Sequence, residues 1–524
     1  MDIGGLIAYI SIIVAGYALL SEERRIDIKL RMTWFEYLIM FGVAIVVLYI
    51  IYLPVLKNVG LLIPLPWLFG FNEMTTVFTS FLLMTVLLVL KLKSNKLPKS
   101  KIGRFNVISK NLLAQKQLKP LGYLFERYHD QVIDILGREP WYVRWHNKLN
   151  PGFVFSLTSE PEKISWLSKL WTSTKSFLSR IFPSSYKCGN IAREGVTKLL
   201  KSKQFVRYIT STYPLVGAKF TLKNYDGDDE FRKTYFVELI SNHQSALYRE
   251  LRDNQNCSHT GRYDLDESNA ILSHFFTDIS VASSAQLWKP IGDYVLEFIE
   301  SHKGNEDYYN QINGRFDQGE ERWECPIYVS TILFEIMVTE SLFQRHNDHM
   351  WLMYIQSYVE KIIGSLDPAD DVDLSREFPT RYHFLLYGCI STLSSWVSSI
   401  EHLPELTQEQ NEVCCLNERP ESFACASFGT VIHDILNSAK FEMDKKKYFL
   451  DIALRTLKEL EQNNAQAYID IIVRCIFQRD EYTKVKPKFL QEIAIVFNSS
   501  DHMLKGFNIS FNKQLTDKLK ASAA

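Results

Sequence analysis

The chain has 524 residues, of which 46% are hydrophobic and 23% are charged. This composition excludes a disordered tail and requires at least one large buried core. Lys and Arg number 59 against 60 Asp and Glu, so the formal net charge is −1. That balance lacks the overall basic field of a dedicated nucleic-acid-binding protein, and nucleic acid is therefore not indicated as a partner.

Three stretches near the amino end contain no charged residue: Ile3–Leu20, Tyr37–Leu56 and Met74–Leu90. Each approaches the ~20 residues that a helix needs to cross about 30 Å of hydrocarbon. The first stretch lacks the basic cluster and the small-residue cleavage site of a signal peptide, which favours a retained helix. The sequence therefore predicts three transmembrane helices that form an anchor over residues 1–92.

Positive charges between these stretches predict the orientation of the helices. Four of them follow the first stretch and only Lys57 follows the second. A second basic group follows the third stretch and consists of Lys91, Lys93, Lys96, Lys99, Lys101 and Arg104. Because basic loops resist translocation, we expect the amino terminus outside and the chain from about residue 91 inside the cytoplasm, as in a multi-pass protein of the bacterial inner membrane. We also expect the second group to contact anionic lipid head groups.

Small residues share one face of the first stretch, at Gly4, Ala8, Ser11 and Ala15. Such a face lets another helix backbone approach closely. The contact is expected either with another helix of the same chain or with a second copy of the protein.

The third stretch has a polar side, made of Thr75, Thr76, Thr79, Ser80 and Thr85. These hydroxyls could line a water-filled path, or they could return to carbonyl groups one turn earlier in the same helix. No ionisable residue lies inside any of the three stretches. An ion-coupled transporter, which needs ionisable groups within the membrane, is therefore disfavoured.

After the anchor, apolar residues recur at spacings of three and four, the period of an amphipathic helix. The pattern is visible in Phe236–Leu251, Val281–Ile299, Ile332–Phe343, Phe384–Val397 and three segments between Val431 and Ile476. A strand is expected only in short segments such as Ala218–Leu222, where alternate residues are apolar. The fold class is thus mainly α.

Polar connectors suggest a boundary near Tyr225 within the region after the anchor. We expect a basic juxtamembrane linker and membrane-proximal helical unit over residues 93–225, and a helical cytoplasmic domain over 226–524. Successive helical pairs also fit a solenoid, although no fixed repeat period is present.

The sequence contains no Gly-rich phosphate loop, no nucleophile elbow and no His-Glu-x-x-His motif. Neither a cofactor nor a metal ion is therefore expected. Arg376 and His383 have a spacing similar to that of the Arg and His pair in the helical HEPN ribonucleases. The resemblance implies that the arginine would hold a phosphate while the histidine assists proton transfer.

An amino-terminal anchor with a large helical body resembles the architecture of membrane-anchored effectors in bacterial anti-phage defence. The resemblance implies an abortive-infection effector or sensor that perturbs the membrane after oligomerisation or a signal. Its partners would be membrane lipid and either another protein or a second copy of the chain. Two alternatives stay open: a non-catalytic scaffold that tethers a cytoplasmic partner, and a ribonuclease-like enzyme.

Overall fold

The structure is a computed structural model. It describes residues 15–60, 73–93, 96–137, 143–144, 187–222, 228–253, 257–258, 262–266, 268–346, 350–403, 419–463, 465–479 and 485–523. Of the described residues, 78% are helical, and these residues contain two isolated bridges but no strand. The predicted mainly α fold class is confirmed.

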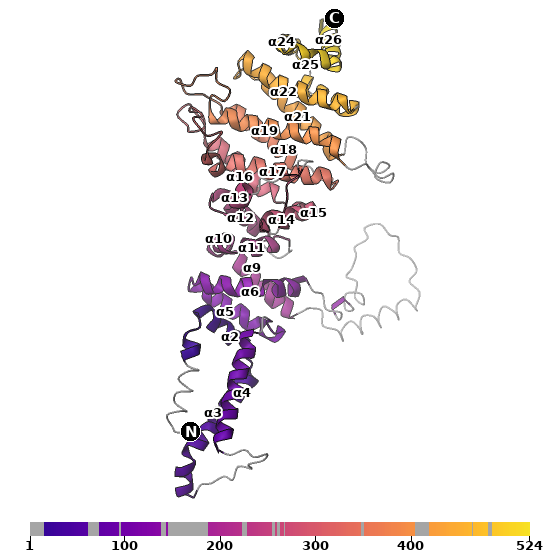
Figure 1. Ribbon diagram of the computed structural model, residues 1–524. Coiled ribbons are helices and arrows are strands. Elements are labelled where there is room, and N and C mark those ends of the chain that lie inside the picture. Colours follow the sequence, from indigo (N-terminus) through magenta and orange to yellow (C-terminus); the bar gives the residue numbers. More distant parts are fainter. Residues whose placement is uncertain are drawn as a thin grey trace, which may run out of the picture. The chain divides into compact units, whose positions relative to one another are not determined.

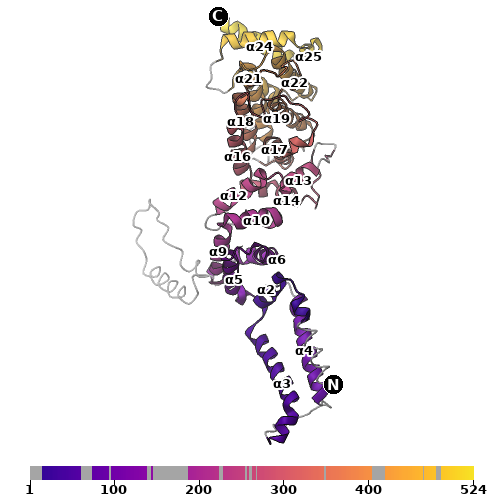
Figure 2. The same cartoon turned by 90° about the vertical axis from the view of Figure 1, so that its left-hand side faces the viewer.

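The chain forms two compact units. The first comprises Met1–Ile209 with Lys223–Asp228, and the second comprises Thr210–Leu222 with Asp229–Ala524. The division passes through α10 (Lys203–Thr212) and falls after the first residue of α12 (Asp228–Ser241). Figures 1 and 2 show the helices of each unit from two directions.

The other described helices of the first unit are α2 (Glu22–Arg31), α3 (Trp34–Asn58), α4 (Glu73–Lys93), α5 (Ile102–Ala114), α6 (Leu118–Gly137) and α9 (Lys187–Leu200). Helices α5, α6 and α9 pack against one another, and α2 contacts α4, α5 and α6. Helix α3 packs along α4, and the pair extends away from α5 and α6 in Figure 1.

The second unit begins with short helices: α11 (Pro214–Phe220), α12 (Asp228–Ser241), α13 (Ala246–Asp253), α14 (Ala270–Phe276) and α15 (Ile279–Ala285). The next helices are α16 (Trp288–Ser301), α17 (Pro326–Phe343), α18 (Met350–Ser365), α19 (Arg381–Ser398), α21 (Pro420–Asn437), α22 (Met443–Gln462) and α23 (Gln466–Phe477). The unit ends with α24 (Pro487–Ser499), α25 (His502–Phe507) and α26 (Ile509–Ala523). From α16 to α26, each helix packs mainly on helices near it in sequence (Figure 2).

Helix α17 forms the centre of the second unit. It contacts α16, α18, α19 and α21, and most of its side chains are buried. Among the described residues, α17 is the one unbroken helix that is both long and apolar enough to cross a membrane, but 78% of it is buried inside the protein. Its apolar composition is therefore that of a core helix.

Two segments of the predicted anchor come close to being long and apolar enough to cross a membrane. Helix α2 and the first part of α3, Trp34–Ile50, meet it only when they are taken together across a bend of 101°. In α4, the apolar segment Thr75–Lys91 is shorter than the required length. Of the first predicted span, residues 3–14 lie outside the described residues.

The expected strand at Ala218–Leu222 is wrong, because most of this segment belongs to α11. Pro214 occupies the first turn of that helix, where a missing backbone N–H costs nothing. Val216, Ala218 and Phe220 are all buried, so the alternation of apolar residues was too short to distinguish a strand from a small buried helix.

Two of the expected helices are each broken into two. The segment Phe236–Leu251 is interrupted between α12 and α13. The segment Val281–Ile299 is interrupted at Gln286, whose backbone adopts the left-handed conformation with φ of 51° and ends α15. Non-glycine residues seldom adopt this conformation, and no glycine in the sequence signals the break.

Candidate functional site at the apolar hairpin

The start of α3 is fixed by a reciprocal cap. Thr33 Oγ1 accepts a hydrogen bond from the Glu36 N–H at 3.3 Å, and Glu36 Oε2 accepts one from the Thr33 N–H at 2.7 Å. This capping box satisfies backbone donors that would otherwise lack partners at the helix start. Only Met32 and Thr33 lie between α2 and α3, so the end of α2 and the first turn of α3 stay close together.

Helices α3 and α4 run antiparallel, since Lys91 near the end of α4 forms an ion pair with Glu36 near the start of α3, at 2.6 Å. Between the two helices, Val77 and Phe81 pack against Val43 and Ile50. The start of α3, which follows α2, and the end of α4, which leads toward α5, therefore lie at the same end of the hairpin.

The outer surface of this hairpin is apolar over most of its length. Trp34 is 76% exposed and Phe41 is 67% exposed. Other exposed large apolar side chains on the two helices are Phe35, Leu38, Ile45, Leu48, Tyr52, Val55, Phe78, Leu82, Leu83, Val86, Val89 and Leu90. A contiguous apolar surface of this kind marks an interaction with a membrane or with another protein.

The threonines of α4 form hydrogen bonds within their own helix. Thr79 Oγ1 donates to the Thr75 carbonyl at 2.7 Å, and Thr85 Oγ1 donates to the Phe81 carbonyl at 3.0 Å. Thr75 and Thr79 are exposed, whereas Thr76 and Ser80 are half-buried. At Thr79 and Thr85 the hydroxyls thus return to carbonyls one turn earlier, and the water-filled path stays a prediction.

The basic residues after α4 differ in their surroundings. Lys93, Lys96 and Arg104 are exposed, and Lys101 is half-buried. Lys91 is paired with Glu36, and the side chain of Lys99 lies outside the described residues. Exposed basic side chains therefore flank the end of α4.

Of the predicted small-residue face, Gly4, Ala8 and Ser11 lie outside the described residues. Ala15 is described and exposed, and its carbonyl accepts a hydrogen bond from the Leu19 N–H at 2.8 Å. The predicted contact face thus stays a prediction.

A buried charged cluster joins α2 to α6. Asp27 and Arg31 are 1% and 2% exposed, and Arg31 Nη2 lies 2.6 Å from Asp27 Oδ2. The hydroxyl of Tyr128 donates a hydrogen bond to Asp27 Oδ1, while Arg127 Nη1 lies 3.5 Å from Asp27 Oδ2. Burial, together with this hydrogen bond, raises the pKa of the Tyr128 phenol above its usual value.

Removing one member of such a cluster leaves a charge buried without its partner, which is strongly unfavourable. The cluster therefore requires α2 and α6 to stay packed together. The sequence alone does not reveal it, because Arg31 is simply one of the four positive charges that follow the first uncharged stretch, and a count of charges does not indicate burial. The spacing of four between Asp27 and Arg31 was the available signal, since it places both on one helical face.

The structure places Arg376 and His383 in different surroundings. Arg376 is exposed and precedes the first residue of α19, and its Nε lies 3.8 Å from Asp373 Oδ2. His383 is 5% exposed, and its Nδ1 is hydrogen-bonded to Thr380 Oγ1 at 2.8 Å. Burial and the nearby charge of Lys445 lower the pKa of His383 to about 4, so its imidazole is neutral at pH 7.

Two further features bear on chemistry elsewhere in the second unit. An open groove of about 480 Å³ is lined by charges of both signs, including Arg249, Arg252, Glu320 and Glu324. Within the described ranges, no three His, Cys, Asp or Glu side chains lie close enough together to hold a metal ion.

Comparison of the chain with protein-family models, with curated proteins and with solved structures found no match.

Proposed function

We propose that the protein is a membrane-anchored effector or sensor whose α3–α4 hairpin lies in a lipid bilayer. The observation that carries the proposal is the exposed apolar surface of the hairpin, which extends along both helices. Helix α3 has 25 residues and α4 has 21. At about 1.5 Å per residue, both are long enough for about 30 Å of hydrocarbon.

The Glu36–Lys91 pair supports an orientation for the hairpin. It brings both charged ends to one side, where the basic residues of α2 and those after α4 would face the same aqueous phase. By the positive-inside rule this phase is the cytoplasm of a bacterium, and Lys93, Lys96 and Arg104 would contact anionic lipid head groups. The first predicted span would then put the amino terminus outside, as in a multi-pass inner-membrane protein.

The link between α2 and α6 supports an active role for the hairpin. Because Asp27 holds α2 against α6 and only two residues separate α2 from α3, a displacement of α6 would tilt α3 in the bilayer. The second unit, whose layers of helices suit a solenoid-like binding surface, would receive the signal from a partner protein or a second copy of the chain. Perturbation of the membrane after such a signal is the action expected of an abortive-infection effector.

A non-catalytic scaffold is the second candidate. The internal hydrogen bonds of Thr79 and Thr85 favour it, because hydroxyls satisfied within the helix need no water-filled path. In that case the hairpin would only tether the second unit to the membrane.

Membrane insertion is tested by carbonate extraction of membranes that contain the full chain or its variants. Leu83→Arg places a charge midway along the exposed side of α4, at a cost of about 2.5–3.5 kcal/mol for a membrane helix. Val107→Arg is the matched control, because Val107 is also exposed but lies on α5. We expect the wild type and Val107→Arg to stay in the membrane pellet and Leu83→Arg to be lost from it. A wild-type chain that is freely soluble without detergent would overturn the proposal.

An anchor exchange separates the effector from the scaffold. Residues 1–92 are replaced by an unrelated anchor of the same topology, and membrane potential is followed with a voltage-sensitive dye during overexpression. An effector loses depolarisation and toxicity on exchange, whereas a scaffold retains its phenotype. The ribonuclease alternative is tested in the same assay with His383→Ala, since an unchanged phenotype would end it.

A further inference from the structure

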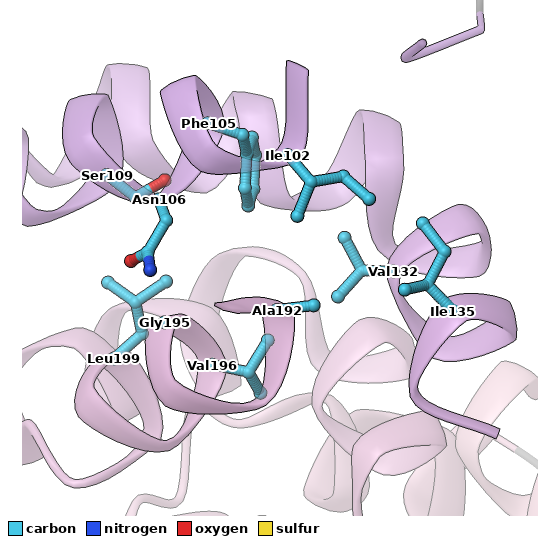
Figure 3. A pocket seen from close by; sticks show the side chains of 10 residues that line it. All are labelled: Ile102, Phe105, Asn106, Ser109, Val132, Ile135, Ala192, Gly195, Val196 and Leu199. Atoms are coloured by element: carbon cyan, nitrogen blue, oxygen red, sulfur yellow. The ribbon is translucent and has the colours of Figure 1, made fainter. Parts of the chain in front are cut away.

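A small cavity lies inside the first unit, between α5, α6 and α9 (Figure 3). Its wall is mostly aliphatic, but two polar side chains, Asn106 and Ser109, project into it from successive turns of α5. The free volume is about 10 Å³, close to the least that holds one water molecule. A larger ligand does not fit.

Both polar side chains are buried and incompletely hydrogen-bonded. Asn106 is 7% exposed and Ser109 is 1% exposed. Asn106 Nδ2 donates to the Ile191 carbonyl on α9 at 3.1 Å. In contrast, Asn106 Oδ1 and Ser109 Oγ have no hydrogen-bond partner within the part of the chain that the structure describes. Buried polar atoms in native proteins are nearly always paired, often with ordered water.

Gly195 on α9 gives Asn106 the room it occupies. A Cβ atom at this position would lie 2.5 Å from Asn106 Oδ1, which is far inside the contact distance of the two atoms. Because Gly195 has no side chain, the amide oxygen of Asn106 can lie against α9 beside the cavity. A larger residue at this position would push that oxygen away from the cavity.

We propose that this cavity binds a single ordered water molecule between Asn106 and Ser109. The water donates a hydrogen bond to Asn106 Oδ1 and accepts one from the Ser109 hydroxyl, so both unpaired atoms gain a partner. The apolar wall excludes an ion, because nothing in it would compensate a full charge. This site is independent of the membrane proposal, since all its residues belong to the α5, α6 and α9 packing.

Substitution of Ser109 distinguishes a hydrated cavity from a dry one, because the two cases predict opposite changes in the stability of the packing between α5 and α9. In a dry cavity, Ser109→Ala removes an unpaired buried hydroxyl and strengthens the packing. In a hydrated one, it removes a partner of the water and leaves Asn106 Oδ1 poorly satisfied. Asn111→Ala, at an exposed position of the same helix, is the control for the higher helix propensity of alanine.

The measurement is hydrogen exchange of the full chain, followed by mass spectrometry of peptides from α5 and α9. Relative to Asn111→Ala, we expect Ser109→Ala to lower the protection of the α5 and α9 amides against exchange by about fivefold. This factor corresponds to one typical hydrogen bond. Unchanged or increased protection would overturn the proposal. A map of the protein that shows ordered waters elsewhere in the first unit should also show a peak within hydrogen-bond distance of Asn106 Oδ1 and Ser109 Oγ, and an empty cavity in such a map would likewise overturn it.

Discussion

Tyr128 and Asp27 lie 101 positions apart in sequence, yet the hydroxyl of Tyr128 on α6 donates a hydrogen bond to the carboxylate of Asp27 on α2. The same carboxylate is paired with Arg31 at 2.6 Å. This contact ties the helix that precedes the apolar hairpin to the packed helices of the first unit. In the function that we propose, a signal would reach α3 through this contact.

Replacing Asp27 by asparagine should destabilise the packing of α2 on α6 by about 3–5 kcal/mol, because Arg31 stays buried without its counter-charge. Tyr128→Phe, which removes only the hydroxyl, should cost about 1–2 kcal/mol. Hydrogen exchange of α2 and α6 peptides measures both effects. Glu22→Gln, at an exposed position of α2, is the control and should change little. Equal exchange in Asp27→Asn and Glu22→Gln would show that the cluster does not hold α2 in place.

In the second unit, Asn310 is fully buried and its side chain is hydrogen-bonded to three backbone groups. Its Nδ2 donates to the carbonyls of Gly304 and Ser365 at 3.0 and 2.9 Å, and its Oδ1 accepts from the Asp367 N–H at 2.8 Å. Asn310→Ala leaves these buried groups without partners, and we expect a loss of at least about 2 kcal/mol in the free energy of unfolding. Thermal unfolding of the purified chain checks this value. The neighbouring exposed variant Gln311→Ala should stay near the wild type, and a similar midpoint for both variants would contradict the prediction.

Glu335 on α17 should make the second unit less stable at higher pH. Burial raises the pKa of its carboxyl from 4.5 to about 7. The native state therefore binds more protons than the unfolded state between these values, so the free energy of unfolding falls as the pH rises through them. Burial also raises the pKa values of Tyr263, Cys257 and Tyr328, which stay protonated in this range.

The measurement is the difference in unfolding midpoint between pH 5 and pH 8. Glu335→Gln should reduce the loss of stability on going to pH 8, because its side chain cannot ionise. Glu324→Gln, at an exposed position, should keep the pH dependence of the wild type. The prediction is refuted when all three proteins lose the same amount of stability.

Two glycines should respond oppositely to alanine. A Cβ atom at Gly429 on α21 would lie 2.6 Å from the Ile472 carbonyl oxygen and 2.7 Å from Cys475 Cβ, both on α23. Backbone cannot move aside cheaply, so Gly429→Ala should cost about 1–3 kcal/mol. At Gly388 on α19 nothing lies within 4 Å of the added atom, and alanine should gain about 0.5–1 kcal/mol. If both variants shifted the unfolding midpoint in the same direction, the close approach of α21 to α23 at Gly429 would be contradicted.

Much of the helical body could be predicted from the sequence, because amphipathic periodicity reports which residues face a core. The segments from Phe384 to Val397 and from Phe449 to Leu460 lie within α19 and α22. Periodicity does not report where a helix stops when no glycine or proline marks the end, as at Gln286. Nor does periodicity indicate that most side chains of α17 are buried, since only part of its apolar surface follows a spacing of three and four.

The candidate site was less predictable than the fold. Basic residues near the hairpin look alike in sequence, yet Arg24 is exposed while Arg31 is buried. Arg31 is paired with Asp27 on its own helix, and Asp27 in turn accepts a hydrogen bond from Tyr128 on α6. The spacing of four indicates the pair, but no local pattern indicates that α6, about a hundred positions later, buries it. The same holds for Asn106, whose surroundings depend on Gly195 in another helix.

The burial of α17 also has a consequence for synthesis of the chain. While the polypeptide leaves the ribosome, Pro326–Phe343 emerges before α18, α19 and α21, which later cover it. During that interval a hydrophobic segment of 18 residues is available to any machinery that inserts helices into membranes. Rapid docking onto the α16 already made would be the first protection against misinsertion, and a polypeptide that terminates before α18 would aggregate.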